Sequence, residues 1–426
     1  MTTSVEQLFD LKQSYEMVER LERVVPGGGI YFTRSPRFAS YGEFPAFLRS
    51  ADGSRITDVD GNSYIDFICA FGPIILGYNH PAVEAAANRQ QAAGNALSFM
   101  PEVLVELAEK LAARWSPEET GAERFADWLI FAKNGSDVTT LATRVARLHT
   151  GRPVILAARD AYHGFDTWSV PGGAGIPEGH RSDIDFFEWN DVASLNEAFE
   201  RNDGRVASAI LCPIRHDSGH DIEMPSAEFV AAIHAALRSA DALLIMDDIR
   251  AGFRLHPSGA SHLALGFKPD LVCFGKALGN GHPISALTGR DELKETTSAV
   301  YFSGTHFCAA TPMVAAVAVL DAYDDEQVFD RVTQAGERLR DGIAAAAHRF
   351  GVEISLSGPA AMPNMLFADD QGLKKMRRWA GHVARRGVIL HPRHNWFLSS
   401  AHSDADIDEA VEVAERAFEL VASGGE

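Results

Sequence analysis

Two short apolar runs, each followed by a charged residue, constrain this chain more than any other feature. Residues 242–246 precede Asp247, and residues 271–274 precede Gly275 and Lys276. Short, unbroken apolar runs between turn-forming residues are typical of buried strands in a parallel sheet. Because ligands bind beyond the carboxyl ends of such strands, we expect Asp247 and Lys276 to face one crevice.

A buried lysine opposite a buried carboxylate has a specific chemical use. Burial disfavours the ammonium form, which lowers the lysine pKa and makes the amine nucleophilic. A Schiff-base lysine and an acid that keeps a pyridine nitrogen protonated are the pair that pyridoxal phosphate (PLP) requires. An ordinary internal ion pair explains this stretch equally well, so the rest of the chain must decide.

The middle of the chain alternates strands and helices. Further buried strands are predicted at 128–131, 153–157, 207–211 and 284–288, and helices at 81–93, 101–114, 138–148, 226–240 and 312–323. This rhythm predicts an α/β fold, with a mostly parallel central sheet and helices on both faces. We expect residues 67–324 to form this large domain.

The two ends of the chain show a different pattern. An amphipathic helix is predicted at 5–23, antiparallel strands at 47–50, 55–59 and 64–67, strands of a second small sheet at 352–356, 365–367, 388–390 and 396–398, and helices at 327–350 and 405–422. We expect residues 1–66 and 325–426 to pack together as a small α+β domain.

Charge and cysteine usage exclude several classes of protein. The formal net charge of −19 argues against nucleic-acid and anionic-membrane partners. The four cysteines contain no CxxC pair, so neither a metal site nor a disulfide framework is expected. The first residues carry charges throughout and lack the apolar core of a signal peptide, so a cytoplasmic location is expected.

Two polar turns follow predicted strands. Gly135 and Ser136 lie between a strand and a helix, where free amides and the helix dipole can bind an anion, although a plain helix cap is the simpler reading of this turn alone. Tyr162 and His163 follow the strand at 153–157 and can either stack on a flat ring or pack within a loop.

Several motifs, in order along nearly the whole chain, resemble the class III aminotransferases, which are fold-type I PLP enzymes. They are Val25-Pro26-Gly27-Gly28, the run from Asp58 to Asp66, Gly135-Ser136, Tyr162-His163-Gly164, Asp247-Asp248, Gly275-Lys276, Gly304-Thr305 and Ser399-Ser400-Ala401-His402. The resemblance is to the branch that includes glutamate-1-semialdehyde aminomutase. Within it, residues 133–137, 250–254 and His391-Pro392 with His394-Asn395 are most similar to amine:pyruvate transaminases that deaminate hydrolysed fumonisin.

The resemblance implies a role for each matching residue. Lys276 holds PLP and moves the substrate proton, while Asp247 pairs with the pyridine nitrogen. The other implied cofactor contacts are Tyr162 on one ring face with His163 in support, Ile249 on the other face, Gly135 and Ser136 at the phosphate, and Thr305 at the phosphate of a neighbouring subunit. The last contact implies a homodimer with shared active sites. Asp248 replaces the usual Glu, and a structural role is expected for it.

The substrate residues are less closely defined by the resemblance. A substrate carboxylate requires a cation that binds it bidentately, for which Arg34 leads and Arg393 is the alternative. Tyr31, Phe71 and Trp396 are candidates to shape an apolar amine pocket, and core packing is an equal alternative for each.

The expected function is therefore an amine transaminase that moves an amino group to pyruvate from an amine, with bulky and long-chain amines among the candidate donors. It releases a ketone or aldehyde and alanine. An aminomutase or racemase is the alternative with the same chemistry, and a non-catalytic PLP-fold binding protein is the alternative from another class. Cys212-Pro213 in place of Glu-Pro, and the sequence His306-Phe307-Cys308, weaken the aminomutase assignment.

Overall fold

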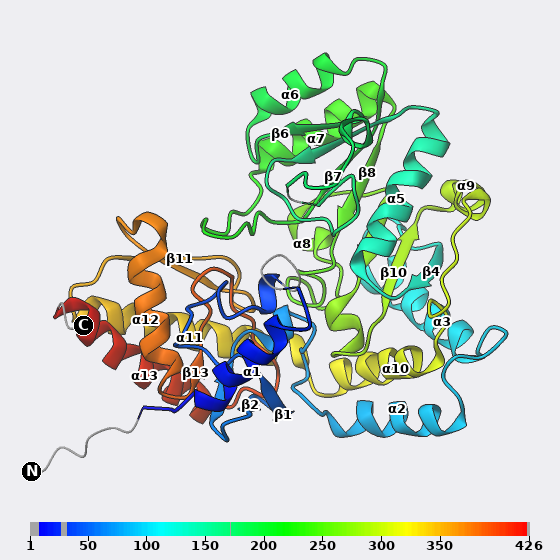
Figure 1. The fold of residues 1–426 in the computed structure, drawn as a ribbon. Coiled ribbons are helices and arrows are strands. Elements are labelled where there is room, and N and C mark those ends of the chain that lie inside the picture. Colours follow the sequence, from blue (N-terminus) through cyan, green and yellow to red (C-terminus); the bar gives the residue numbers. More distant parts are fainter. Residues whose placement is uncertain (1–7, 27–31, 171, 424–426) are drawn as a thin grey trace, which may run out of the picture.

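A large mixed sheet forms the centre of the upper part of the protein in Figure 1. The computed structural model describes residues 8–26, 32–170 and 172–423, and within them this sheet has seven strands. In spatial order they are β4 (Trp128–Ala132), β10 (Ser285–Gly289), β9 (Leu271–Phe274), β8 (Leu243–Asp247), β7 (Val206–Leu211), β5 (Val154–Ala158) and β6 (Ile184–Phe187). Strand β10 runs antiparallel to both neighbours, whereas the other paired strands are parallel.

Both faces of this sheet are buried because helices cover them. In β8, Leu243 and Ile245 join a cluster with the apolar side of α5 (Gly135–Thr150), and Leu244 and Met246 face the opposite cluster, which contains α7 (Ala227–Ala240). Successive strand residues point to opposite faces, so a strand covered on both sides must be apolar throughout.

The remaining helices flank the sheet or belong to the second part of the chain. They are α1 (Lys12–Glu22), α2 (Pro81–Ala93), α3 (Val103–Arg114), α4 (Pro117–Thr120), α6 (Val192–Arg201), α8 (His262–Leu265), α9 (Lys294–Ala299), α10 (Ala310–Asp325), α11 (Val328–Arg349), α12 (Lys374–Ala384) and α13 (Asp404–Ala422). No helix within the described ranges is long and apolar enough to cross a membrane.

The two ends of the chain meet in a four-stranded sheet, ordered β1 (Leu48–Asp52), β2 (Arg55–Asp58), β3 (Ser63–Asp66) and β13 (Val388–Ile389). Strand β13 pairs in parallel with β3, and Arg55 forms an ion pair with Asp406 of α13 at 3.0 Å. Figure 1 accordingly shows the blue amino-terminal elements among the orange and red carboxyl-terminal ones. The domain boundaries at 66 and 325 stay a prediction.

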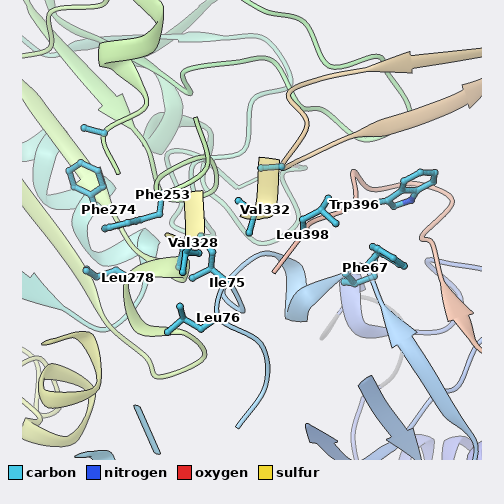
Figure 2. Packing of buried hydrophobic residues seen from close by; sticks show 14 of the residues in the cluster. Phe67, Ile75, Leu76, Phe253, Phe274, Leu278, Val328, Val332, Trp396 and Leu398 are labelled. Carbon is cyan, nitrogen blue, oxygen red and sulfur yellow. The ribbon is translucent and has the colours of Figure 1, made fainter. Parts of the chain in front are cut away.

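The hydrophobic core runs without interruption from the large sheet to the small one. Figure 2 shows Phe253 and Phe274 of the large part, Val332 of α11 and Phe67 near the small sheet within this one cluster. Trp396 belongs to the same cluster and is 1% exposed. A continuous core fixes the two parts relative to each other and so fixes the crevice beside them.

The α/β class with a mostly parallel central sheet and helices on both faces is confirmed, and its six predicted strands occur within two residues of their expected bounds. The second small sheet was predicted too large. It contains β11 (Ile354–Ser357) and β12 (Asn364–Phe367) alone among the described strands, because 388–389 joins the other sheet. Residues 396–398 form no strand; Phe397 N bonds Phe67 O and the neighbouring amides bond other segments.

Candidate active site

A cavity of about 440 Å³ opens beyond the carboxyl ends of the parallel strands. Its wall is formed by segments that follow five different strands, and it includes seven residues expected from the sequence: Gly135, Ser136, Tyr162, His163, Asp247, Ile249 and Lys276. Folding therefore brings together residues that are far apart in the chain. The volume lies in the usual range for a small-molecule site.

Asp247 ends β8 and is buried beside His163. His163 Nδ1 donates to Asp247 Oδ2 over 2.7 Å, because an ionised carboxylate can only accept. Cys212, at the end of the adjacent strand β7, places its sulfur 3.9 Å from the same ring nitrogen. Burial raises the pKa of the Cys212 thiol well above its usual range, so this neighbour is neutral. The carboxylate is held in one orientation and faces the cavity.

Lys276 lies on the same cavity wall directly after β9. Burial, and next the positive charge of Arg250, lower its pKa to about 7, while the negative charge of Asp247 opposes this effect. Its backbone φ of +44° lies in the left-handed region, which few residues other than glycine adopt. Such strain, of about 1–3 kcal/mol, is found mainly at functional sites. The amine is therefore a base and a nucleophile near neutral pH.

The amino terminus of α5 closes one end of the cavity. The helix begins at Gly135, and Asp137 caps it by accepting the Asn134 amide over 2.7 Å. The amides of Gly135 and Ser136 are in the first turn, where no intrahelical acceptor exists, and both residues line the cavity. Free amides and the positive end of the helix dipole together make an anion site.

Ile249 and Tyr162 line the cavity near this helix terminus. Ile249 packs so closely on the turn that a Cβ at Gly135 would be 2.7 Å from Ile249 Cδ1. Tyr162 also lines the cavity and is half exposed, although burial raises the pKa of its phenol. The close packing of Ile249 therefore requires glycine at position 135. Ile249 provides an apolar contact and Tyr162 an aromatic contact for a planar ring bound in the cavity.

The expected substrate residues lie elsewhere. Arg34 is exposed, with its guanidinium 5.7 Å from the centre of the Phe71 ring, and Arg393 lies 5.3 Å from the Phe38 ring. Neither arginine lines the cavity, nor does Phe71. Tyr31 falls outside the described residues.

Two further residues are also placed away from the cavity wall. Trp396 lies in the core, where its indole donates to His391 O over 3.1 Å, so the structure supports the core-packing alternative for this residue. Thr305 is exposed in the single chain. This exposure agrees with the expected contact with a neighbouring subunit, which stays a prediction.

Arg250 and His216 line the cavity, and the sequence analysis did not select either. Arg250 could have been found from its position three residues after Asp247. Asp247 ends a strand at the crevice, and a residue that follows so closely can line the same crevice. His216 gave no such signal, because it lies in an irregular segment after β7. Asp248 points away from the cavity, accepts the Ser261 amide over 2.7 Å and has a pKa raised to about 8 by burial, in agreement with a structural role.

Comparison with known proteins defines first a broad class and then a family. The fold and the cavity are those of a fold-type I PLP-dependent transferase. A solved structure of the PLP form of the FumI protein from Sphingopyxis sp. MTA144 superposes with a TM-score of 0.91 at 39% identity, covering 96% of each chain. The family model "Aminotransferase class-III" matches residues 38–418. The protein belongs to the class III aminotransferase family.

Two curated relatives show its place in the family. Aminopentol aminotransferase of Sphingopyxis macrogoltabida is 40% identical over 95% of this chain and 94% of its own. Glutamate-1-semialdehyde 2,1-aminomutase of Deinococcus radiodurans is 31% identical over 96% and 97% of the two chains. The protein is an aminotransferase that uses PLP, which excludes the non-catalytic alternative, and the resemblance seen in its motifs is confirmed.

The residues present fit PLP, whose ring acts as an electron sink for carbanion chemistry when it is bound. The fit rests on the donor set: a nucleophilic lysine, a buried carboxylate opposite it and free amides at the start of α5. We propose that Lys276 holds the cofactor, Asp247 keeps the proton on its ring nitrogen, and Gly135 and Ser136 bind its phosphate. Tyr162 with His163, and Ile249, would then enclose the two ring faces.

Proposed function

We propose that this protein transfers the amino group of an amine to pyruvate, giving a ketone or aldehyde and alanine. The observation that carries the proposal is the buried Lys276 amine, with a pKa lowered to about 7, in a cavity whose acid is hydrogen-bonded to His163. Such an amine takes a proton from the carbon that bears the substrate nitrogen. The hydrogen bond from His163 fixes the orientation of the Asp247 side chain. The name of the 40% identical relative supports an aminopolyol or another long-chain amine as the donor.

The experiment is a panel of amines, tested with pyruvate and scored by alanine formation. Lys276→Ala is expected to abolish alanine formation and the visible absorption change on adding amine, because the other lysine of the described cavity wall, Lys133, follows β4 and not β9. Lys268→Ala removes an exposed lysine paired with Glu123 and is the matched control. Absence of alanine with every amine, together with isomerisation of an amino acid without any acceptor, would instead establish the aminomutase, which the 31% identical relative keeps as the second candidate.

We further propose that the active protein is a homodimer with shared sites. Leu97, Phe99, Met100 and Tyr301 are large apolar side chains that are half exposed or more, and Phe99 is 88% exposed. The chain after Tyr301 reaches the segment that carries the other three, since Ala310 N donates to Asn95 O over 2.9 Å. Exposure of several large apolar side chains to water is unfavourable, which supports a second copy as the cover.

A hybrid dimer tests whether the site is shared. One protomer carries Lys276→Ala and the other Thr305→Ala. If Thr305 contacts the phosphate in the partner's site, the hybrid has one site with both native residues and recovers native PLP affinity there. If Thr305 serves its own site, neither site is native and affinity stays low. Light scattering of the wild type reports the dimer itself.

A further inference from the structure

Arg250 is the arginine that reaches the cavity wall, among the described residues. It follows Asp247 and Ile249 at the end of β8, and its Nη1 donates to the carbonyl oxygen of His216 over 3.0 Å. That bond uses one of the five donors of a guanidinium. Within the described chain, Arg250 forms no ion pair, since the nearby acids bond other groups: Asp217 bonds Arg215 and Asp247 bonds His163.

His216 provides a second polar group beside Arg250. Its side chain is 7% exposed, lines the cavity, and has its Nε2 atom buried without a hydrogen-bond partner. Burial, and next the positive charge of Arg250, keep the pKa of His216 well below its usual value, so the ring is neutral. A buried polar atom without a partner is destabilising, and a ligand in the cavity can provide the missing hydrogen bond.

The charge of the wall indicates what kind of ligand completes this corner. Lys133, Arg250 and Lys276 line the cavity, and Asp247 is the acid in the described wall. The helix terminus at Gly135 can take one anion, the cofactor phosphate. Arg250 lies on the wall with Lys276, has no ion-pair partner among the described residues, and can take a second anion close to the reacting amine.

We propose that Arg250, positioned by the His216 carbonyl, binds the carboxylate of the 2-oxo-acid acceptor, with His216 Nε2 as a further contact. This inference rests on the proposed transamination. A planar guanidinium with free donors matches the two oxygens of a carboxylate, whereas an ammonium offers one point charge. Arg34 and Arg393, which the sequence suggested for this role, lie on ring faces outside the cavity.

The test compares two acceptors of equal length, pyruvate and propanal, in the acceptor half-reaction of the fully loaded enzyme. Arg250→Met keeps an unbranched, apolar stem at this position and removes the charged guanidinium. It is expected to lower kcat/KM for pyruvate about 10- to 100-fold, chiefly through KM, and to change kcat/KM for propanal less than threefold. Arg250→Lys keeps the positive charge but lacks the planar guanidinium. Its kcat/KM for pyruvate should lie between the values of the wild type and Arg250→Met. Arg34→Met and Arg393→Met are the matched arginine variants.

Two results of the acceptor comparison would overturn the inference. Equal losses with both acceptors would mean that Arg250 serves the cofactor or the fold, and a pyruvate-selective loss in a matched variant would assign the carboxylate to that arginine instead. Binding of propanoate, an unreactive carboxylate, is measured calorimetrically on the same loaded proteins and should weaken in Arg250→Met. Native propanoate binding in that variant also contradicts the inference. If the wild type makes no alanine from any amine, the transamination proposal fails separately, and the propanoate measurement still decides the carboxylate site.

Discussion

The Lys276 amine is predicted to titrate far below an ordinary lysine once the cofactor is removed. Its pKa is lowered from 10.5 to about 7. At pH 7 about half of these amines are therefore neutral, compared with roughly 1 in 3,000 for amines that titrate at 10.5. The difference corresponds to about 5 kcal/mol by which the cavity disfavours the ammonium form.

Competitive acetylation of the apoprotein measures this pKa directly. The peptide that contains Lys276 is quantified by mass spectrometry after brief exposure to acetic anhydride across pH 5 to 11, with the peptide of exposed Lys268 as the internal reference for reagent reactivity. The midpoint is expected near pH 7. Because the Arg250 charge lowers this pKa and the Asp247 charge raises it, Arg250→Met should move the midpoint up and Asp247→Asn should move it down. A wild-type midpoint above pH 9 would refute the reasoning.

The same titration has a consequence for stability with a definite sign. Between pH 7 and 10.5 the unfolded chain holds the Lys276 proton and the folded chain does not, so the contribution of this group to stability rises with pH in that window. The penalty at pH 7 is about 4 kcal/mol and falls to about 2 kcal/mol at pH 9. Lys276→Met should therefore raise the thermal midpoint of the apoprotein, and raise it more at pH 7 than at pH 9. A pH-independent difference would contradict this.

Two further substitutions test the walls of the cavity. Asp247→Asn keeps the shape of the side chain but removes its charge. It should weaken PLP binding about 100-fold or more, since losing one partner of a buried charge pair costs about 3–5 kcal/mol. Equilibrium dialysis of PLP measures this affinity, and native affinity would show that PLP binding does not use the charge. Gly135→Ala places a methyl group 2.7 Å from Ile249 Cδ1 and should lower PLP affinity and cost about 1–3 kcal/mol of stability. Gly173→Ala, where an added Cβ meets nothing within 4 Å, is its control, and equal behaviour of the two variants would reject the packing argument.

The grouping of Asp247 and Lys276 on one cavity wall could be predicted from the sequence because both residues lie at strand ends. Asp247 and Lys276 each follow a run of apolar residues, and parallel strands bring such positions to one edge whatever the details of packing. The same holds for the turn at Gly135. The large sheet was predictable for the same reason, since strands buried on both faces are apolar throughout.

Contacts that depend on the direction of a side chain could not be predicted from strand ends in this way. Trp396 satisfies its indole with the His391 carbonyl and can therefore be buried, which composition does not reveal. Arg250 turns into the cavity because the His216 carbonyl holds it there, and that contact joins loops after two different strands. Arg34 matched a family motif, but the structure places it outside the cavity wall, over the Phe71 ring.

The pairing of β13 with β3 has a consequence for biosynthesis. Ile65 emerges early from the ribosome, but its partner Val388 is made near the end of translation. During most of synthesis the outer edge of β3 has unpaired amides and carbonyls, while the whole large sheet can already assemble behind it. A nascent chain stalled before residue 388 should therefore expose the unpaired edge of β3 beside an assembled large sheet. Such a chain should depend on chaperones to stay soluble.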